Sequence, residues 1–367
     1  MSSTPIDQPT ETGSDWRTPP EPDLRHFLKM TDDTGMFQHA LYSVPDPNHG
    51  YCIDDNARAL IAAVLHAELF GYDEAVVPVH RYLQFLTYAY NEDAQAFRNF
   101  MGYDRRWLED VGSPDSQGRT VWALGTAALH AIDADTRDLA LQLLHRALPG
   151  ISRFIDLRAK AFTLIGLEHW LTVESDCAEA RAIRDRYAKD LLRAFRDHTD
   201  ENWVWCEPVA TYDNAKLCHA LLVAGRGMGR DDMIEQGLAS LRWLLQVQTA
   251  DEGHLSIIGN DGWLPRGGQR AQFDQQPLEA HAMVHGCLAA ARISGDLQWA
   301  DQAWRCFQWF HGRNDLGIPL YVAETGGCMD GLQPDGANRN QGAESTLAYL
   351  LSVLELNIFA RKHAEPQ

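Results

Sequence analysis

The feature that most constrains the fold is a regular alternation between two kinds of predicted helix. Apolar, alanine-rich segments recur at intervals of roughly 40 to 65 residues, beginning near Asp55, Arg119, Leu157, Asp213, Glu279 and Ala343. Each has an amphipathic neighbour. A helix that is apolar on all sides is buried, whereas a helix with one polar face lies at the surface. Six buried helices inside six amphipathic ones predict an all-α fold, the (α/α)6 toroid, which is a closed ring of six helical hairpins.

The helical periodicity gives approximate bounds for these elements. The predicted inner helices span residues 55–70, 119–132, 156–171, 213–225, 278–294 and 343–359. The predicted outer helices span residues 23–29, 75–90, 138–148, 178–198, 231–248 and 296–314. No long run alternates with period two, so strands are expected only as short ribbons in the long loops.

The domain organisation is simple. Residues 1–22 are rich in Ser, Thr, Pro, Asp and Glu, so we expect a disordered tail, and they lack the features of a signal peptide. Residues 23–367 form one predicted toroid domain. Seven cysteines without CxxC spacing favour a reducing, cytoplasmic compartment. No apolar run reaches the length of a membrane span, so we expect no membrane partner.

Charge narrows the choice of ligand. The formal net charge is -19, which disfavours nucleic acid and anionic membranes, because both reward basic patches. A neutral, polyhydroxylated ligand is compatible with it. No dinucleotide fingerprint, phosphate-binding glycine loop or serine elbow is present, so no cofactor is predicted. Cys206, Cys218 and His219 fit no standard zinc spacing, so no metal is predicted either.

The acidic helix starts predict where a site lies. The run from Gly50 to Leu65 contains Asp54 and Asp55 at the start of an apolar helix, and the Asp-Asn-Ala-basic order recurs from Asp213. Inner helices of a ring are parallel, so their N-termini share one face. The long loops precede these helices, and we therefore expect this face to gather Trp107, Asp115, Trp203, Trp205, Glu207, His254, Trp263, Asp274, Tyr321 and Asp330.

Carboxylates and aromatic rings on one face favour glycosidic chemistry, in which one acid protonates the leaving oxygen and a carboxylate activates water. Glu207, between Trp205 and Pro208, is the predicted acid, because apolar neighbours raise a carboxyl pKa. Asp54 is the predicted base, because a helix N-terminus stabilises the ionised form. Glu344 and Asp213 are held in reserve. The predicted stacking walls are Trp107, Trp203, Trp205 and Trp263.

Further residues are predicted to bind substrate hydroxyls. They are Asp33, Asp55, Asp115, Arg158, Tyr212, His254, Asp274, Glu279 and His281. For each acid among them, helix capping or pairing with arginine is the competing interpretation. Histidines suggest a different chemistry: a facing pair could move a proton at a sugar carbon, as an epimerase or isomerase requires. The candidates for such a pair are His39, His49, His254, His281 and His285.

Three motifs add a resemblance to known proteins. They are Thr31-Asp32-Asp33-Thr34-Gly35, the run from Gly50 to Arg58, and the run from Gly118 to Gly125. With the helical pattern, they resemble the six-hairpin glycosidase superfamily. More narrowly, they resemble a bacterial helical-toroid family whose members are often fused to, or encoded beside, glycosyltransferases and mannoside phosphorylases. The resemblance implies the toroid fold and carbohydrate processing.

The resulting hypothesis is a glycoside hydrolase that acts on a short oligosaccharide, with mannosides as one option. An inverting mechanism is expected, since it is common in that superfamily. Two alternatives stay open: a sugar epimerase or isomerase that uses histidines, and a non-catalytic carbohydrate-binding partner of a glycosyltransferase. The expected ligand is a small oligosaccharide, and a homodimer or a glycosyltransferase partner is left open.

Overall fold

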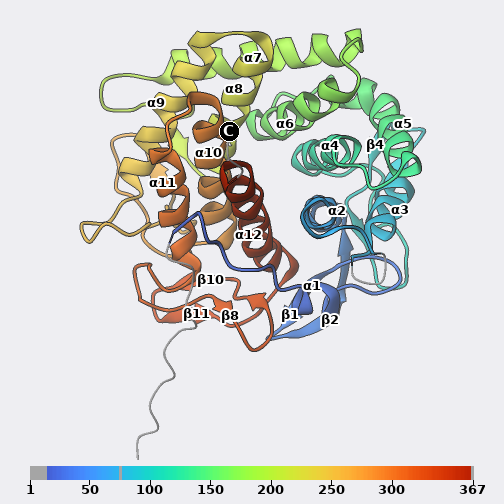
Figure 1. Ribbon diagram of the computed structural model, residues 1–367, viewed down its shortest axis with the longest axis horizontal. Coiled ribbons are helices and arrows are strands. Elements are labelled where there is room, and N and C mark those ends of the chain that lie inside the picture. The colour runs from blue at the N-terminus through green and yellow to red at the C-terminus, as the bar shows by residue number, and fades with distance from the viewer. Residues whose placement is uncertain (1–14, 74–76, 365–367) are drawn as a thin grey trace, which may run out of the picture.

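The protein is a ring of paired helices, as the computed structural model shows for residues 15–73 and 77–364 (Figure 1). The inner helices are α2 (Ile53–Phe70), α4 (Pro114–Leu129), α6 (Leu157–Val173), α8 (Asn214–Met228), α10 (Pro277–Ser294) and α12 (Ala343–Ala364). The outer helices are α1 (Arg25–Lys29), α3 (Val79–Ala89), α5 (Ala134–Ile151), α7 (Ala178–His198), α9 (Asp231–Val247) and α11 (Gln298–Phe307), which continues into the 3-10 turn η1 (Gln308–Phe310).

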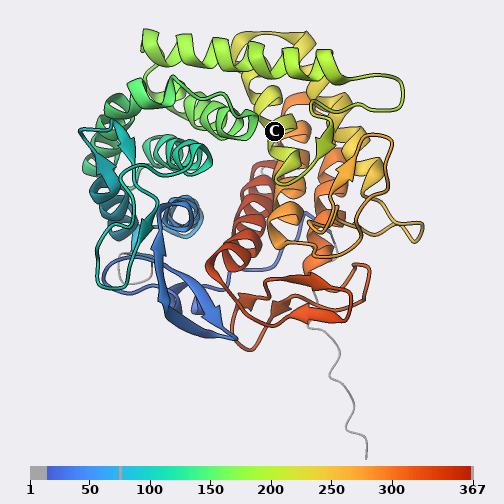
Figure 2. The same cartoon turned by 180° about the vertical axis from the view of Figure 1, so that it is seen from behind.

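The ring is closed. Each inner helix packs against the next, and α12 packs against α2, so the last hairpin meets the first. Each outer helix covers its inner partner, with α1 lying against α12. Both faces of the ring are visible in Figures 1 and 2. The predicted all-α (α/α)6 toroid is therefore confirmed.

Two helix starts differ from the prediction. We expected Asp54 or Asp55 to cap the first inner helix, but α2 begins earlier and its N-cap is Cys52, whose Sγ accepts the amide of Asp55. The next inner helix begins at Pro114, where Ser113 caps the first turn and proline suits the first helical position. The loop before it is shorter than predicted, because Asp115 already belongs to the first turn.

Short strands occupy the loops. β1 (Phe37–Leu41), β2 (Val44–Cys52) and β5 (Phe100–Met101) form a three-stranded antiparallel sheet. The segment with Pro45, Pro47 and Gly50 was predicted to be a loop, but it forms β2. Pro45 instead pairs with Ala40 near the end of the hairpin, where a missing amide is tolerated. The remaining two-stranded ribbons pair β3 (Tyr90–Asn91) with β4 (Ala96–Phe97), β6 (Val209–Ala210) with β7 (Leu264–Pro265), β8 (Tyr321–Val322) with β9 (Gly327–Cys328), and β10 (Gly331–Gln333) with β11 (Gly336–Asn338).

The segment before α1 is packed against the ring. Trp16 is buried, its Nε1 donates to Oδ1 of Asp301 at 2.9 Å, and its ring makes an edge contact with Phe359. Residues 15–22 therefore do not belong to a disordered tail, because an indole with an apolar contact and a hydrogen-bond partner gains more by burial than by exposure. Residues 1–14 lie outside the described part of the chain.

One helix in the described ranges, α12, is long and apolar enough to cross a membrane by length and composition. A buried core helix can have the same length and composition. Here 89% of the apolar window is buried within the ring. We therefore treat α12 as a core helix.

Candidate functional site

The inner helices bring their N-terminal turns together around a central depression. A cavity of about 380 Å³ is lined by residues of α2 and α12, and a second of about 360 Å³ reaches α4 and α10. The two cavities share Asp54, Asn99, Gln276 and Glu344 on their walls. A third, of about 300 Å³, continues from Gln276 toward the ribbon of β10 and β11. The predicted common face is thus where the structure offers connected space.

Asp54 lies at the junction of the two larger cavities. Its Oδ2 accepts from Arg119 at 2.7 Å and from Arg58 at 3.0 Å. Burial would raise the pKa of this carboxyl, but the two guanidinium charges outweigh it and hold the pKa below its usual value. Oδ1 is buried and accepts no hydrogen bond within the described structure. Asp54 is therefore an ionised carboxylate on the wall of both cavities, with Oδ2 held by two arginines and Oδ1 covered by protein.

Two arginines distribute this charge around the ring. Arg58 donates through its two terminal nitrogens to Asp54 and, at 3.0 Å, to Glu344 of α12. Arg119 donates likewise to Asp54 and, at 2.7 Å, to Oδ2 of Asp213 before α8. The two terminal nitrogens of a guanidinium are close together. The acceptor oxygens of Asp54 and Glu344 therefore lie within roughly 8 Å of each other.

Asp213 has a strained backbone. Its φ is 49°, a left-handed conformation that is uncommon outside glycine and asparagine. Its side chain makes no capping hydrogen bond to α8, and its own amide donates to Glu279 of α10. Burial, followed by the charge of Asp213, raises the pKa of Glu279. Strain of this kind is often found at functional sites.

Three further carboxyls near the cavities have raised pKa values, and burial is the main cause for each. The pKa of Asp55 rises to about 7, although Arg58 opposes the shift. The pKa of Asp330 rises to about 6, although the amide of Gly342 opposes the shift. The pKa of Asp115 is raised as well, although Tyr212 donates to it at 2.6 Å. The site therefore combines an ionised carboxylate with carboxyls that hold protons at higher pH.

The remaining walls are polar and aromatic. Trp263 and Tyr212 line the cavity of about 360 Å³, with ring centroids 6.4 Å apart. His39 lines the cavity of about 380 Å³, where burial and the neighbouring His49 lower its pKa. Amides from Asn99 and Gln276 supply hydrogen-bond donors and acceptors. Polar groups of this kind can bind the hydroxyl groups of a sugar, and the aromatic rings can stack on the face of a sugar ring.

Glu207, the predicted acid, is placed differently. Both of its carboxylate oxygens accept from one terminal nitrogen of Arg158, at 2.8 and 2.9 Å. Arg158 also donates to the carbonyl of Tyr212 and lies over its ring. Glu207 is not among the residues that line the cavities described above. The pair of Glu207 and Arg158 supports Tyr212 from behind, and we do not assign Glu207 the acid role.

The predicted stacking walls must also be corrected. Trp205 is fully buried and stacks on Trp243 of α9, while Trp203 is 4% exposed and meets the same ring edge-on. Trp107 packs against Phe85 and Tyr88. Trp203 and Trp205 are therefore packed against α9, and Trp107 is packed against α3. Of the four tryptophans predicted as walls, Trp263 lines a described cavity.

The other predicted binding residues lie at different places in the structure, and only some of them line the central cavities. Asp33 is largely exposed and pairs with Arg105, which keeps it in solvent. His254 pairs with Asp315 and lines a groove beside α11, away from the central cavities. Asp274 lines the cavity of about 300 Å³. His281 is buried on α10, on the side of the helix that faces Glu355 of α12.

Sequence reasoning passed over three residues. The contact between Arg58 and Asp54 could have been predicted from the sequence, because residues four apart on a helix are neighbours on its surface. Arg119 directly follows a glycine in a quoted motif, but its partners lie 65 and 94 residues away. Asp330 was expected on this face without a role, since its burial depends on how the last loop folds.

A scan against protein-family models found no match, and neither did a search of curated proteins. Solved structures, in contrast, are similar in fold. The cellobiose 2-epimerase of Bacillus thermoamylovorans has a TM-score of 0.72 at 12% identity, over 92% of this chain and 96% of that one.

Two further solved structures have the same fold. A D-mannose isomerase has a TM-score of 0.69 at 10% identity, over 90% of this chain and 94% of that one. An inactive α-1,6-mannanase variant of a Salegentibacter species, solved with α-1,6-mannotetrose, has a TM-score of 0.61 at 12% identity, over 91% of this chain and 96% of that one. This chain shares the toroid fold of sugar epimerases, sugar isomerases and glycosidases.

Proposed function

We propose that the protein is a glycoside hydrolase that acts on a short, neutral oligosaccharide. The observation that carries the proposal is Asp54, an ionised carboxylate at the junction of two cavities. Asp330 faces the same cavity, and burial raises its pKa to about 6. A low-pKa base and a high-pKa acid in one cavity are the pair that glycoside hydrolysis uses.

In this mechanism Asp330 protonates the leaving oxygen and Asp54 activates a water molecule. Arg58 and Arg119 keep Asp54 ionised and hold its Oδ2, and the carboxylate receives the proton of that water. Glu344 accepts a hydrogen bond from the other terminal nitrogen of Arg58, and it is the alternative candidate for the acid or the base. Its separation from Asp54, at most roughly 8 Å, allows both the inverting spacing of about 6.5–9.5 Å and the retaining spacing of about 5–5.5 Å, so the product anomer has to distinguish them.

The surroundings support a neutral sugar. Asp54, Asp55, Asp330 and Glu344 surround the first cavity and Arg58 is the cation on its wall, so phosphate or uronate groups would be repelled. The three cavities together leave room for more than one sugar ring. The mannanase variant described as inactive has two consecutive aspartates replaced. Asp54 and Asp55 are consecutive here, which makes mannosides the first substrates to test.

The test is turnover of a panel of neutral manno- and gluco-oligosaccharides, with the first-formed anomer followed by NMR. We expect hydrolysis with inversion, and losses of about 10² to 10⁴ in kcat for Asp54→Asn and Asp330→Asn. Asp251→Asn is the matched control, because Asp251 is exposed. Full activity in Asp54→Asn would refute the assignment, and a retained anomer would refute inversion.

A second candidate is a sugar epimerase or isomerase. The observation that favours it is His39, a cavity residue whose depressed pKa keeps the imidazole neutral and able to accept a proton. Solved epimerases and isomerases also share the fold. Incubation of cellobiose or mannose in D₂O distinguishes the two. Deuterium at C2 that disappears in His39→Asn would support this candidate, and binding without turnover would favour a carbohydrate-binding role.

A further inference from the structure

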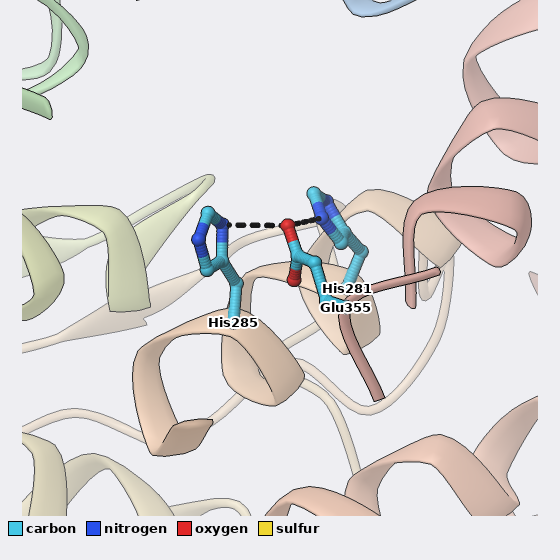
Figure 3. A group of neighbouring side chains, drawn as sticks. All are labelled: His281, His285 and Glu355. Atoms are coloured by element: carbon cyan, nitrogen blue, oxygen red, sulfur yellow. Dashed lines mark hydrogen bonds and ion pairs between the residues drawn. The ribbon is translucent and has the colours of Figure 1, made fainter. Parts of the chain in front are cut away.

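Deeper in the ring, three buried side chains from two inner helices face one another (Figure 3). His281 and His285 lie one helical turn apart on α10, and Glu355 comes from α12. Nδ1 of His285 is 3.1 Å from Oε1 of Glu355, and Nε2 of His281 is 3.5 Å from the same oxygen. The ligand atoms of the three residues all lie within 4.8 Å of one another.

We propose that His281, His285 and Glu355 form a binding site for a divalent metal ion of the zinc class, separate from the sugar cavities. Two imidazoles and one carboxylate are a known zinc ligand set that leaves a fourth position open. With metal–ligand bonds of about 2.0–2.1 Å, ligand atoms in a tetrahedral site lie roughly 3.3 Å apart. The distances of 3.1 and 3.5 Å from the two imidazoles to Oε1 of Glu355 lie on either side of that value.

The burial of the cluster suits this role. His281 and His285 are both buried on α10, and neutral imidazole is the form that binds metal. Oε2 of Glu355 and Nδ1 of His281 are buried and have no hydrogen-bond partner in the described chain. Oε2 belongs to the same carboxylate as the ligand atom Oε1, so a cation held against both oxygens would offset the cost of burying it.

An access route lies on the opposite side of the ring from the sugar cavities. A cavity of about 230 Å³ is lined by His285 and Glu355 together with Trp122, Thr126 and His169. Leu129, Arg292 and Lys362 also line it, and they come from the C-terminal parts of their helices. The cavity therefore gives the ion a path and leaves room for a water ligand at the open position.

Lys216 of α8 is the competitor. Its Nζ is 2.7 Å from Nδ1 of His285 and 4.3 Å from the centre of the Trp122 ring. If Nδ1 of His285 accepts a hydrogen bond from Lys216, it carries no proton. Its lone pair then lies 3.1 Å from Oε1 of Glu355, and the two acceptor atoms repel each other. A metal ion satisfies both of these atoms at once, but it must displace the ammonium. The affinity of the site is therefore set by competition between an ion and Lys216.

The experiment measures metal binding by the full chain, with Zn²⁺ followed by calorimetry and Co²⁺ by its visible absorption. We expect one Zn²⁺ per chain and a tetrahedral Co²⁺ spectrum. Lys216→Met should tighten binding by about ten- to a hundredfold, because the competitor is gone. Glu355→Gln and His281→Asn should weaken it by a similar factor or more.

His66→Asn is the control, because His66 is a mostly buried histidine of α2 outside the cluster. It should bind metal like the unaltered protein, and circular dichroism should show every variant folded. Equal binding by Glu355→Gln and the unaltered protein would mean adventitious metal only and would overturn the proposal. Absence of a Co²⁺ spectrum in the folded Lys216→Met variant would overturn it as well.

Discussion

At the scale of single residues, burial separates tryptophans that the sequence could not distinguish. Trp205 has no exposed surface, so Trp205→Ala should lower the free energy of unfolding by about 3–5 kcal/mol. Trp263 lines the cavity, so Trp263→Ala should chiefly raise KM, by roughly three- to tenfold for a stacking contact. Urea unfolding and steady-state kinetics of the two variants check this. A large stability loss in Trp263→Ala with unchanged KM would contradict it.

A carboxyl far from the site makes stability depend on pH. Burial raises the pKa of Glu168 to about 7, although Arg184 at 3.8 Å opposes the shift, and Oε1 has no hydrogen-bond partner in the described structure. The folded state therefore holds this proton to a higher pH than the unfolded state does. The group lowers stability as pH rises from about 4 to 7, and the loss is complete above that window.

Glu168→Gln removes this dependence. At pH 8 the variant should be more stable than the unaltered protein by about 1–3 kcal/mol, and the gain should shrink at pH 5.5. Thermal and urea unfolding at both pH values measure the difference. Glu235→Gln, at an exposed position of α9, is a control that should show no such trend. A gain that does not change with pH would point to packing instead of ionisation.

At the same scale, the limits of sequence reasoning are visible in the carboxylates. Asp54 and Glu344 could be placed on the common face, because a helix start shows in the sequence. The availability of a carboxylate could not be predicted, because it depends on distant partners. Arg158, 49 residues before Glu207, holds that carboxylate behind Tyr212. His281 and His285 have the spacing of one helix face, but Glu355 is 74 residues from His281.

At the scale of helices, packing between α4 and α6 depends on glycine. A Cβ added at Gly125 would lie 2.2 Å from the carbonyl oxygen of Gly166, and one at Gly166 would lie 2.5 Å from that of Val121. Helix propensity favours alanine over glycine by about 1 kcal/mol. The steric cost is larger, so Gly125→Ala should destabilise the protein by about 1–3 kcal/mol or more.

Gly286 of α10 is the matched control. A Cβ there would meet its nearest neighbour at 3.4 Å, which is ordinary contact. Gly286→Ala should be neutral or stabilise by up to about 1 kcal/mol. Urea unfolding of both variants gives the comparison. Equal effects of the two substitutions on the free energy of unfolding would show that the close backbone contact between α4 and α6 does not determine the cost of Gly125→Ala.

The sequence predicted which segments form helices, but it did not predict reliably the residue at which each helix begins. The charged segment 178–198 was predicted with the bounds that α7 has, because its periodicity is strong. The first turn of α4 was missed, since a Ser-Pro start was interpreted as loop. The β1–β2 hairpin was missed for another reason. Its prolines argue against a strand, and its pairing depends on a chain partner that periodicity does not reveal.

At the scale of the whole molecule, ring closure is what brings dispersed charges together. Arg58 joins α2 to α12, and Arg119 joins α4 both to α2 and to Asp213 before α8. The alternation of helices in the sequence was sufficient to predict this common face. The individual arginine–carboxylate pairs on this face were not predictable, because they depend on the distances between the helix N-termini.

This network predicts how the molecule responds to loss of one cation. Arg119 is 5% exposed, so Arg119→Met would leave Asp54 and Asp213 close together without their shared partner. Removing one side of a buried pair costs about 3–5 kcal/mol. The cost should be largest at pH 8 and smaller near pH 5.5, because unpaired buried carboxyls have raised pKa values and take up protons as pH falls.

The double variant Arg119→Met/Asp213→Asn tests the cause. Neutralising Asp213 should recover part of the stability, because the uncompensated charge is then removed along with its partner. Arg193→Met on the outer helix α7 is the control and should change stability little, since that side chain is 71% exposed. Unfolding curves of all four proteins at both pH values are required. If Arg119→Met were destabilised equally at both pH values and the double variant recovered nothing, packing of Arg119 over Phe162 would be its main contribution, and the ring would not depend on paired charge.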